Sequence, residues 1–327
     1  MPTQLTTKLS AGSLIFAPME GVTHPLYRKV IETLYPEWDF LCADFLRIPS
    51  QQCYPLKHIR KHFGKDQLSD EKVKAKTILQ ILGPFHAYFQ PTLEQLSELE
   101  IDWIDLNLGC PANTVNKRGG GSALLQDRLQ LEKLLTSIRK NYSGIFTVKT
   151  RLGYESEEGF EDLIKMYEQV GVDAITIHAR TKRDQYQGQA KWDYIAKAVN
   201  LVKVPIIGNG DLWTAQDVKR MFEQTQCHSV MCARGALMNP WLARDYKAPE
   251  KQVSAEKRLM EIEKYFQQLE KVLVSEIDDE KKRYRFYKGL SRYIFDPLSN
   301  GVELKKKVLQ AQSLDLFWSL LADHCLQ

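Results

Sequence analysis

Eight short apolar runs recur along the chain as far as Cys232, and most are followed by a stretch with the spacing of an amphipathic helix. The runs are continuously apolar, which is the pattern of parallel strands buried on both faces. Eight such strand-then-helix units, closed on themselves, form a (β/α)8 TIM barrel of about 250 residues. We therefore expect strands at residues 14–17, 40–43, 77–82, 103–106, 144–148, 174–177, 205–207 and 229–232.

A doubly wound open sheet is the rival arrangement of such α/β units. It would require a nucleotide-binding GxGxxG motif early in the chain, and none occurs there. Beyond about Ala248 the strand pattern stops, and charged stretches with helical spacing follow at residues 254–275, 279–293 and 303–321. With Pro249 as the boundary, the sequence predicts a barrel over residues 1–247 and a small all-helical domain over residues 248–327.

Composition excludes several classes of protein. The 327 residues are 43% hydrophobic, which is enough for a large core. The amino terminus lacks the apolar segment of a signal peptide, and no run approaches the roughly 18 apolar residues of a membrane span. The six cysteines show neither a CxxC pair nor a zinc-ligand spacing, so no disulfide framework or structural metal is indicated. We expect a soluble, cytoplasmic monomer without a protein partner.

Polar residues follow the end of nearly every apolar run. The carboxyl ends of parallel strands meet at one mouth of a barrel, so these residues are predicted to converge there on an active site. Cys110 follows the fourth run and precedes Pro111 and a glycine-rich stretch. Such a segment neither continues a strand nor opens a helix at once, so Cys110 is predicted to lie on a loop held by a rigid frame. The alternative is a small buried thiol.

Two glycine-containing segments, at residues 208–210 and 233–235, follow the seventh and eighth runs. Glycines let backbone amides approach an anion, and Arg234 can supply a bidentate charge. Short glycine pairs also mark ordinary turns, but barrels recurrently hold phosphate after strands seven and eight. The two segments therefore predict a phosphate site.

Lys149 and His178 follow the fifth and sixth runs, and each allows several interpretations. Lys149 could form a Schiff base, place a positive charge beside a cofactor that becomes anionic, or pair with a carboxylate. His178 could be a general acid, a hydrogen-bond partner of a cofactor, or a rim histidine. Gln80, inside a buried run, could make a structural hydrogen bond or point at a ligand. Together, Lys149 and His178 suggest a ring-shaped, electron-accepting cofactor.

A basic run occupies residues 281–292 and contains no acidic residue. On a helix, Lys281, Arg285, Lys288 and Arg292 fall at i, i+4, i+7 and i+11 and form one cationic stripe with aromatic residues beside it. Phosphate backbones suit such a stripe, whereas the alternative is a solvated helix face. The net charge of +4 is too modest to decide between them.

Five segments of the chain resemble the signature segments of the tRNA-dihydrouridine synthases. They are Ala17-Pro18-Met19-Glu20-Gly21-Val22, Asp105-Leu106-Asn107-Leu108-Gly109-Cys110-Pro111, Val148-Lys149-Thr150-Arg151-Leu152-Gly153, Ile177-His178-Ala179-Arg180-Thr181 and Gly208-Asn209-Gly210-Asp211. They occur in the family's order over nearly the whole chain. The first of them, together with residues 42–47, most resembles the bacterial C branch, which acts on uridine 16 of the tRNA D-loop.

The resemblance implies a flavin enzyme that reduces the C5–C6 double bond of a tRNA uridine to 5,6-dihydrouridine. FMN would be the cofactor and NADPH the electron donor, with NADH possible. Cys110 matches the general acid that protonates C5 while the N5 of the flavin gives hydride to C6. Lys149 and His178 match contacts to the isoalloxazine ring, and so do Pro18, Met19, Glu20 and Gln80. The phosphate side is matched by Asn209, Gly210, Asp211, Ala233 and Arg234.

The tRNA side of the resemblance rests on other residues. Asn107 matches a residue near the substrate base, and Arg47 lies in the segment typical of the C branch. Tyr186 could stack on the base or cap the barrel, and the cationic stripe would hold the RNA while the base leaves its stack. One departure is visible, because Ala233 stands where the family more often has glycine.

Three other functions fit parts of this pattern. A flavin-dependent barrel reductase for a small molecule would not require the basic helical region. An aldolase-type barrel would use Lys149 as a Schiff base without flavin. A non-catalytic RNA-binding barrel would need neither a flavin nor Cys110.

Overall fold

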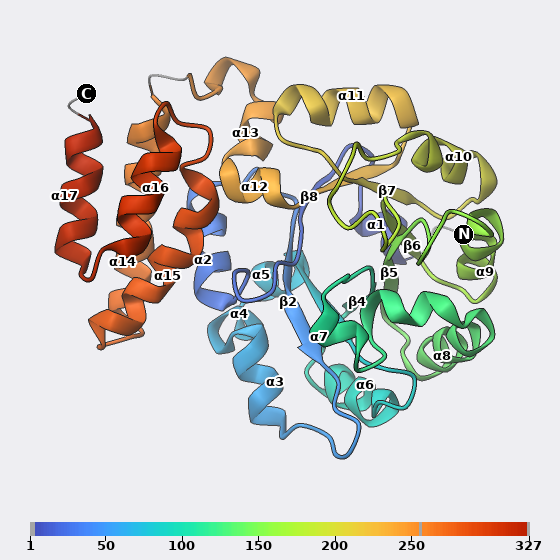
Figure 1. The fold of residues 1–327 in the computed structure, drawn as a ribbon. Helices are drawn as coiled ribbons and strands as arrows, with labels where there is room; N and C mark the ends of the chain where they lie inside the picture. Colours follow the sequence, from blue (N-terminus) through green and yellow to red (C-terminus); the bar gives the residue numbers. More distant parts are fainter. Residues whose placement is uncertain (1–3, 255–256, 326–327) are drawn as a thin grey trace.

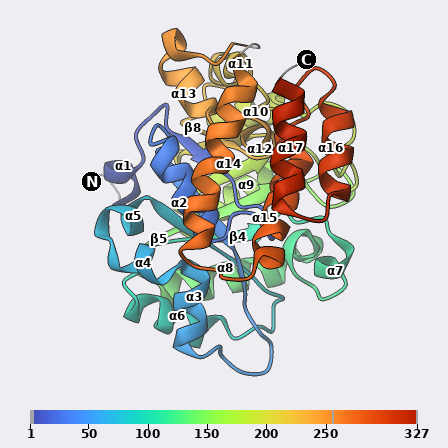
Figure 2. The same cartoon turned by 90° about the vertical axis from the view of Figure 1, so that its left-hand side faces the viewer.

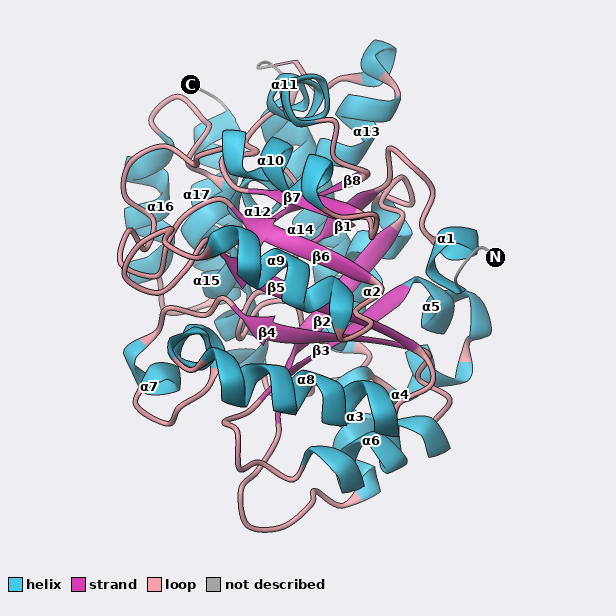
Figure 3. Cartoon of the chain, turned by 90° about the vertical axis from the view of Figure 1, so that its right-hand side faces the viewer, coloured by secondary structure: helices cyan, strands magenta, loops and turns pink. Residues whose placement is uncertain are grey.

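The chain folds into a closed barrel of eight parallel strands in the order β1 to β8 (Figures 1 and 3). The structure is a computed structural model that describes residues 4–254 and 257–325. Ile15 pairs with Phe40 of β2 and with Met231 of β8, which closes the barrel. This confirms the predicted fold. The strands are β1 Leu14–Phe16, β2 Phe40–Arg47, β3 Thr77–Leu82, β4 Trp103–Leu108, β5 Ile145–Arg151, β6 Ala174–His178, β7 Ile206–Asn209 and β8 Ser229–Cys232.

The inward-facing side chains change from apolar to polar along each strand. Side chains alternate across a strand with a period of two, so Trp103 is followed on the inner face of β4 by Asp105 and Asn107. The amino-terminal half of the barrel is filled by an apolar cluster in which the rings of Phe40 and Trp103 lie 5.0 Å apart. Leu5 and Leu9, near the amino terminus, belong to the same cluster. The polar half therefore faces the opposite, carboxyl-terminal mouth.

Several strands extend further than the sequence predicted. β4 was expected to end at residue 106 and β5 at residue 148, but Asn107 pairs with Lys149 in the parallel ladder. The reason is that only the inward-facing residues become polar, while neighbours such as Leu108 still pack outward into the core. Asn107 and Lys149, which were expected to follow these strands, therefore lie within them.

Helices surround the strands and cover their outer face (Figure 3). Residues 48–76 contain three of them, and the apolar side chains of Ile59 and Phe63 in this otherwise polar stretch are fully buried. The helices of the barrel are α1 Gln4–Lys8, α2 Pro25–Leu34, α3 Leu56–Phe63, α4 Lys65–Ser69, α5 Glu71–Lys76, α6 Phe89–Glu98, α7 Asn113–Asn116, α8 Arg128–Asn141, α9 Phe160–Gln169, α10 Asp193–Leu201, α11 Ala215–Thr225, α12 Arg234–Met238 and α13 Leu242–Lys247, with short 3₁₀ turns at Gly121–Gln126 and Pro249–Lys251.

Four further helices form a unit beside the barrel: α14 Arg258–Val274, α15 Glu280–Ile294, α16 Gly301–Gln310 and α17 Leu314–Cys325 (Figures 1 and 2). The third predicted helix, at residues 303–321, is two helices. The first ends at Ala311, whose backbone is not helical, and the Ser313 hydroxyl accepts a hydrogen bond from the amide of Leu316 at the start of the second. α14 packs on α2, where the rings of Tyr35 and Tyr265 stack at 6.5 Å.

The predicted division after residue 247 coincides with the end of α13, but it stays a prediction. Residues 255, 256, 326 and 327 of the predicted helical domain, and residues 1–3 of the predicted barrel, lie outside the described residues. Within the described ranges, no helix combines the length and the apolar character that a membrane crossing requires.

Candidate active site

A cavity of about 540 Å³ opens at the carboxyl mouth of the barrel. Its lining contains every cofactor-site residue predicted from the sequence, together with the predicted acid, the asparagine predicted to lie near the substrate base, and the loop tyrosine. These residues are Pro18, Met19, Glu20, Gln80, Asn107, Cys110, Lys149, His178, Tyr186, Asn209, Gly210, Asp211, Ala233 and Arg234. Arg47 does not line the cavity, but its guanidinium donates to Glu20 at 2.8 Å. Fourteen residues scattered over the sequence are thus brought to one site.

A chain of buried hydrogen bonds leads from Asp105 to the Cys110 loop. Gln80 donates from Nε2 to Asp105 Oδ2 at 2.7 Å and accepts at Oε1 from Asn107 Nδ2 at 2.8 Å. Asn107 Oδ1 in turn accepts from the amides of Gly109 at 3.1 Å and Cys110 at 2.9 Å. Because the Asp105 carboxylate can only accept hydrogen bonds, it fixes the orientation of the side-chain amides of Gln80 and Asn107. The structural interpretation of Gln80 is therefore confirmed, and one N–H of its amide remains for a ligand.

The Cys110 backbone is held from its carbonyl side as well. Its oxygen accepts from the Ser122 hydroxyl at 2.8 Å and from Asn116 Nδ2 at 2.9 Å. The residue is half-buried, which confirms a loop cysteine on a rigid frame rather than a buried core thiol. Burial raises the pKa of the Cys110 thiol above its ordinary value. The thiol therefore keeps its proton at neutral pH and can act as an acid.

His178 is buried in the polar half of the barrel, and Lys149 beside it is half-buried. Lys149 Nζ donates to Asn209 Oδ1 at 3.1 Å, and burial, followed by the charge of Arg151, lowers the Lys149 pKa to about 8. Burial and then the charge of Lys149 hold the pKa of His178 well below its usual range, so the ring is neutral. Arg180 Nη1 lies 3.3 Å from His178 Nε2. Since a guanidinium can only donate, Nε2 accepts and Nδ1 carries the proton.

Arg180 ties the phosphate-site segment to the loop that follows β6. Its Nη2 donates to both carboxylate oxygens of Asp211, at 2.9 and 2.8 Å, and its Nε donates to the carbonyl of Gln187 at 3.1 Å. Asp211 also accepts from the amide of Ala190 at 2.7 Å. Between His178 and Asp211, Gly210 adopts a φ of +121°, and a Cβ there would lie 3.1 Å from His178 Cδ2. The Asp211 carboxylate therefore positions Arg180 and the loop after β6, and as an acceptor it offers no hydrogen bond to an anion.

Arg234 lies between two aromatic rings at the mouth of the cavity. Its guanidinium carbon is 4.7 Å from the ring centres of both Tyr186 and Trp213. Arg151 approaches the same tyrosine at 5.6 Å. These cation–π contacts hold Tyr186 over the cavity although it is half exposed.

The sequence reasoning missed several residues of this site, among them Arg151, Arg180, Trp213 and Tyr293. Arg151 donates from Nε to the carbonyl of Gly109 at 2.7 Å and from Nη1 to Thr181 at 2.7 Å, and it lines the cavity together with Trp213 and Tyr293. Arg180 acts from behind the cavity. Both arginines stand inside the quoted signature segments, so a signal existed. Tyr293 comes from α15, and nothing in its local sequence indicated that the helical unit reaches the barrel mouth.

No cluster of three or more His, Cys, Asp or Glu side chains in the described ranges is arranged to hold a metal ion. The site is instead rich in hydrogen-bond donors and positive charge around one half-buried thiol. Such a set suits a planar anionic or electron-accepting group beside a proton donor.

Comparison of the sequence with family models decides what kind of barrel this is. The model described as dihydrouridine synthase (Dus) matches residues 15–316, which span all eight strands and reach into α17. The chain belongs to the dihydrouridine synthase family. The resemblance carried by its five signature segments is thereby confirmed.

Among the relatives of this dihydrouridine synthase are proteins named tRNA-dihydrouridine(16) synthase. The one from Pseudomonas syringae pv. tomato is 33% identical over 242 residues, covering 73% of this chain and 75% of the relative. The one from Shewanella oneidensis is 34% identical over 239 residues, covering 72% and 75%. The similarity to this branch agrees with the branch inferred from residues 17–22 and 42–47.

Solved structures add support for the fold. Histamine dehydrogenase from Rhizobium sp. 4-9 aligns with a TM-score of 0.56 at 12% identity, over 76% of this chain and 47% of that one. A 2-naphthoyl-CoA reductase complex aligns with a TM-score of 0.53 at 10% identity, over 76% and 52%. The chain spans about half the length of these two proteins, and at such identity they show the barrel fold alone.

Proposed function

We propose that this protein reduces uridine 16 of the tRNA D-loop to 5,6-dihydrouridine, with FMN as cofactor and NADPH as electron donor. The observation that carries the proposal is the position of the protonated Cys110 thiol, which lines the same cavity as Lys149 and His178. Family membership and the names of the relatives support the reaction and its target. The proposal takes the protein to be a cytoplasmic monomer.

The cavity fits FMN in size and in donors. About 540 Å³ lies within the range of small-molecule and cofactor sites. Lys149 and His178 would contact the isoalloxazine ring, with Pro18, Met19, Glu20 and Gln80 around it. Arg234 and the backbone from Asn209 to Asp211 would lie on the phosphate side, where the Ala233 methyl packs against the inner core of the barrel. Bound FMN, once reduced, supplies a hydride for C6 of the uracil.

The residues of the chain supply the proton and the alignment. Asn107, whose amide orientation is set through Gln80 by Asp105, would position the uracil beside Cys110. Cys110 would give its proton to C5, and a thiol with a raised pKa is protonated for that step. The ammonium of Lys149 would stabilise negative charge on the cofactor, and Tyr186 would cover the reacting base and exclude water.

The helical unit would hold the tRNA outside this cavity. Lys281, Arg285, Lys288 and Arg292 lie on α15, and among the described residues no carboxylate lies within 4.0 Å of their charged groups. Tyr293 of the same helix lines the cavity. A phosphate backbone along the stripe would therefore run past the barrel mouth.

The test is the reaction on an unmodified tRNA transcript with FMN and NADPH. Alkali opens the dihydrouridine ring, so primer extension can map the product to single nucleotides. We expect product at position 16 and none at the other D-loop uridines. Reduction of free uridine but not of tRNA would instead favour a small-molecule reductase, and no product on any tRNA would contradict the proposal.

The pH dependence tests the role assigned to Lys149. Its lowered pKa of about 8 means that the ammonium is lost as the pH rises through about 8, so kcat is expected to fall there. The nearby Asp105 carboxylate raises the Lys149 pKa. Asp105→Asn keeps an acceptor for Gln80 but removes the charge, and should move the fall in kcat to lower pH. If kcat of Asp105→Asn fell at the same pH as kcat of the wild type, deprotonation of Lys149 would not be the cause of the fall.

A further inference from the structure

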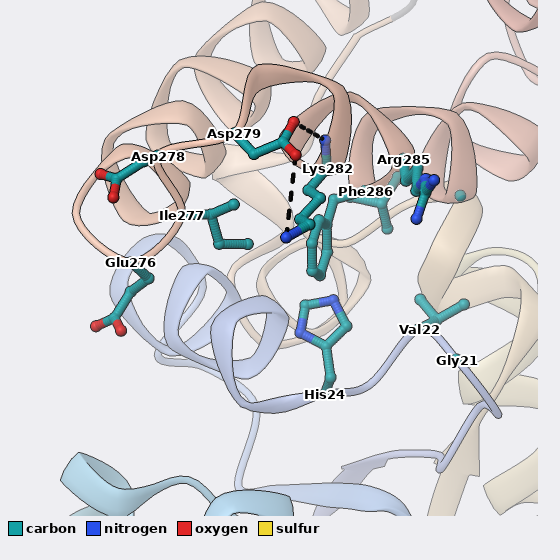
Figure 4. A pocket seen from close by; sticks show the side chains of 12 residues that line it. Gly21, Val22, His24, Glu276, Ile277, Asp278, Asp279, Lys282, Arg285 and Phe286 are labelled. Carbon is teal, nitrogen blue, oxygen red and sulfur yellow. Dashed lines mark hydrogen bonds and ion pairs between the residues drawn. The ribbon is translucent and has the colours of Figure 1, made fainter.

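A second cavity, of about 660 Å³, lies between the helical unit and the loop that follows β1 (Figure 4). Gly21, Val22 and His24 form one wall, and residues 276–290 form the other. Each wall is joined along the chain to a residue that lines the active-site cavity. Glu20 directly precedes the first wall, and Tyr293 follows the second. Tyr293 stands one helical turn beyond Gly289, which lines the second. A chain bound at the barrel mouth would therefore pass this second cavity.

The charges of this cavity are separated between its two sides. Lys282 Nζ lies 3.9 Å from Asp279, whereas no carboxylate of the described residues lies within 4.0 Å of the Arg285 guanidinium. In Figure 4, Glu276 and Asp278 stand on the opposite side of the cavity from Arg285. Arg285, which also belongs to the cationic stripe, is thus the free positive charge on the side nearest Gly21 and Val22.

Two rings lie between these charged sides. The His24 ring meets Phe286 edge to face, with centres 4.5 Å apart (Figure 4). His24 Nδ1 accepts from the amide of Tyr27 at 3.3 Å, and burial lowers the His24 pKa to about 3, so the neutral ring carries its proton on Nε2. Nε2 has no hydrogen-bond partner in the described part of the chain. The rings therefore offer an aromatic surface and one N–H donor.

Gly289 lies in the middle of α15, where glycine weakens a helix relative to alanine. A Cβ at this position would have no heavy atom within 4 Å outside the local helix. No neighbour within the described ranges therefore explains the glycine. The open space above it belongs to the cavity, and a close approach by a bound molecule would account for the absent side chain.

We infer that this cavity binds one unstacked nucleotide of the RNA substrate, next to the uridine that enters the barrel. Its phosphate would meet Arg285, its base would pack on Phe286 and His24, and N–H groups of the base would face Glu276 and Asp278. An anionic polymer is the favoured occupant because the cavity adjoins both the cationic stripe and the mouth of the active site. The inference rests on the proposed tRNA function and adds a second point of recognition to it.

Gly289→Leu places a side chain in the cavity and tests the inference. Leucine is the better helix former, so the melting temperature should equal or exceed that of the wild type. Affinity for unmodified tRNA is expected to fall roughly tenfold, as for the loss of one stacked base. Val302→Leu, on an exposed face of α16, is the matched control and should bind normally. Gly289→Ala should give a smaller loss in the same direction.

Abasic substitutions, placed one at a time in the D-loop beside the target, identify the nucleotide. With the wild type, one of them should weaken binding roughly tenfold, and with Gly289→Leu the same substitution should add nothing. Wild-type affinity of Gly289→Leu, or penalties that stay additive at every position, would overturn the inference. If the losses of affinity from Gly289→Leu and from each abasic substitution are additive while dihydrouridine still forms, only the second site is contradicted. If the two losses are coupled but no dihydrouridine forms, only the proposed reaction is contradicted.

Discussion

Cys110→Ala is expected to lower the rate of dihydrouridine formation by roughly a hundredfold to ten-thousandfold, the usual range for loss of a general acid. The side chain carries the proton, whereas the loop is held by its backbone bonds to Asn107, Asn116 and Ser122. Those bonds survive truncation to alanine. The effect should therefore appear in kcat, with little change in tRNA affinity.

The measurement is single-turnover product formation on unmodified tRNA. Cys53→Ala is the matched control, because Cys53 is also a free, half-buried cysteine but does not line the cavity. It should react like the wild type. Full activity of Cys110→Ala would remove the thiol as proton donor.

Changing Lys281, Arg285, Lys288 and Arg292 to glutamate is expected to remove most tRNA binding at moderate salt. If each cation neutralises one phosphate, the slope of log affinity against log salt should become shallower by about three to four. Lys288 also lies 4.8 Å above the ring of Tyr284, so its change alone should cost some helix packing. FMN binding should be unaffected, because none of the four lines the active-site cavity.

A second quadruple variant separates position from total charge. Lys133, Lys140, Lys165 and Lys203 are exposed and lie on or after the barrel helices α8, α9 and α10. Changing them to glutamate alters the net charge by the same amount, from +4 to −4 (+4 − 4 × 2). This control should bind tRNA far better than the stripe variant. Equal affinities would leave the stripe as an ordinary solvated face.

The sequence was sufficient for the strands because each apolar run is buried on both faces. It was less informative about where the runs end, since the alternation of inward polar and outward apolar residues appears only at their last residues, as at Asp105, Leu106 and Asn107. The convergence of the predicted residues followed from the parallel arrangement of the strands.

Contacts between distant segments could not be predicted. Arg151 reaches Gly109 and Thr181, Arg180 reaches Asp211, and Tyr293 enters the mouth from another unit of the chain. Arginine and tyrosine side chains of this length can meet many partners, and local sequence does not select one. The second cavity was missed for the same reason, because its walls are about 250 residues apart in the sequence.

The most direct test of the proposed reaction is the visible spectrum of the purified protein during one redox cycle. We expect a flavin spectrum that NADPH bleaches and that unmodified tRNA restores faster than free uridine does. A colourless protein that cannot be reconstituted with FMN would contradict the proposed mechanism, and so would a reduced flavin whose reoxidation is indifferent to tRNA.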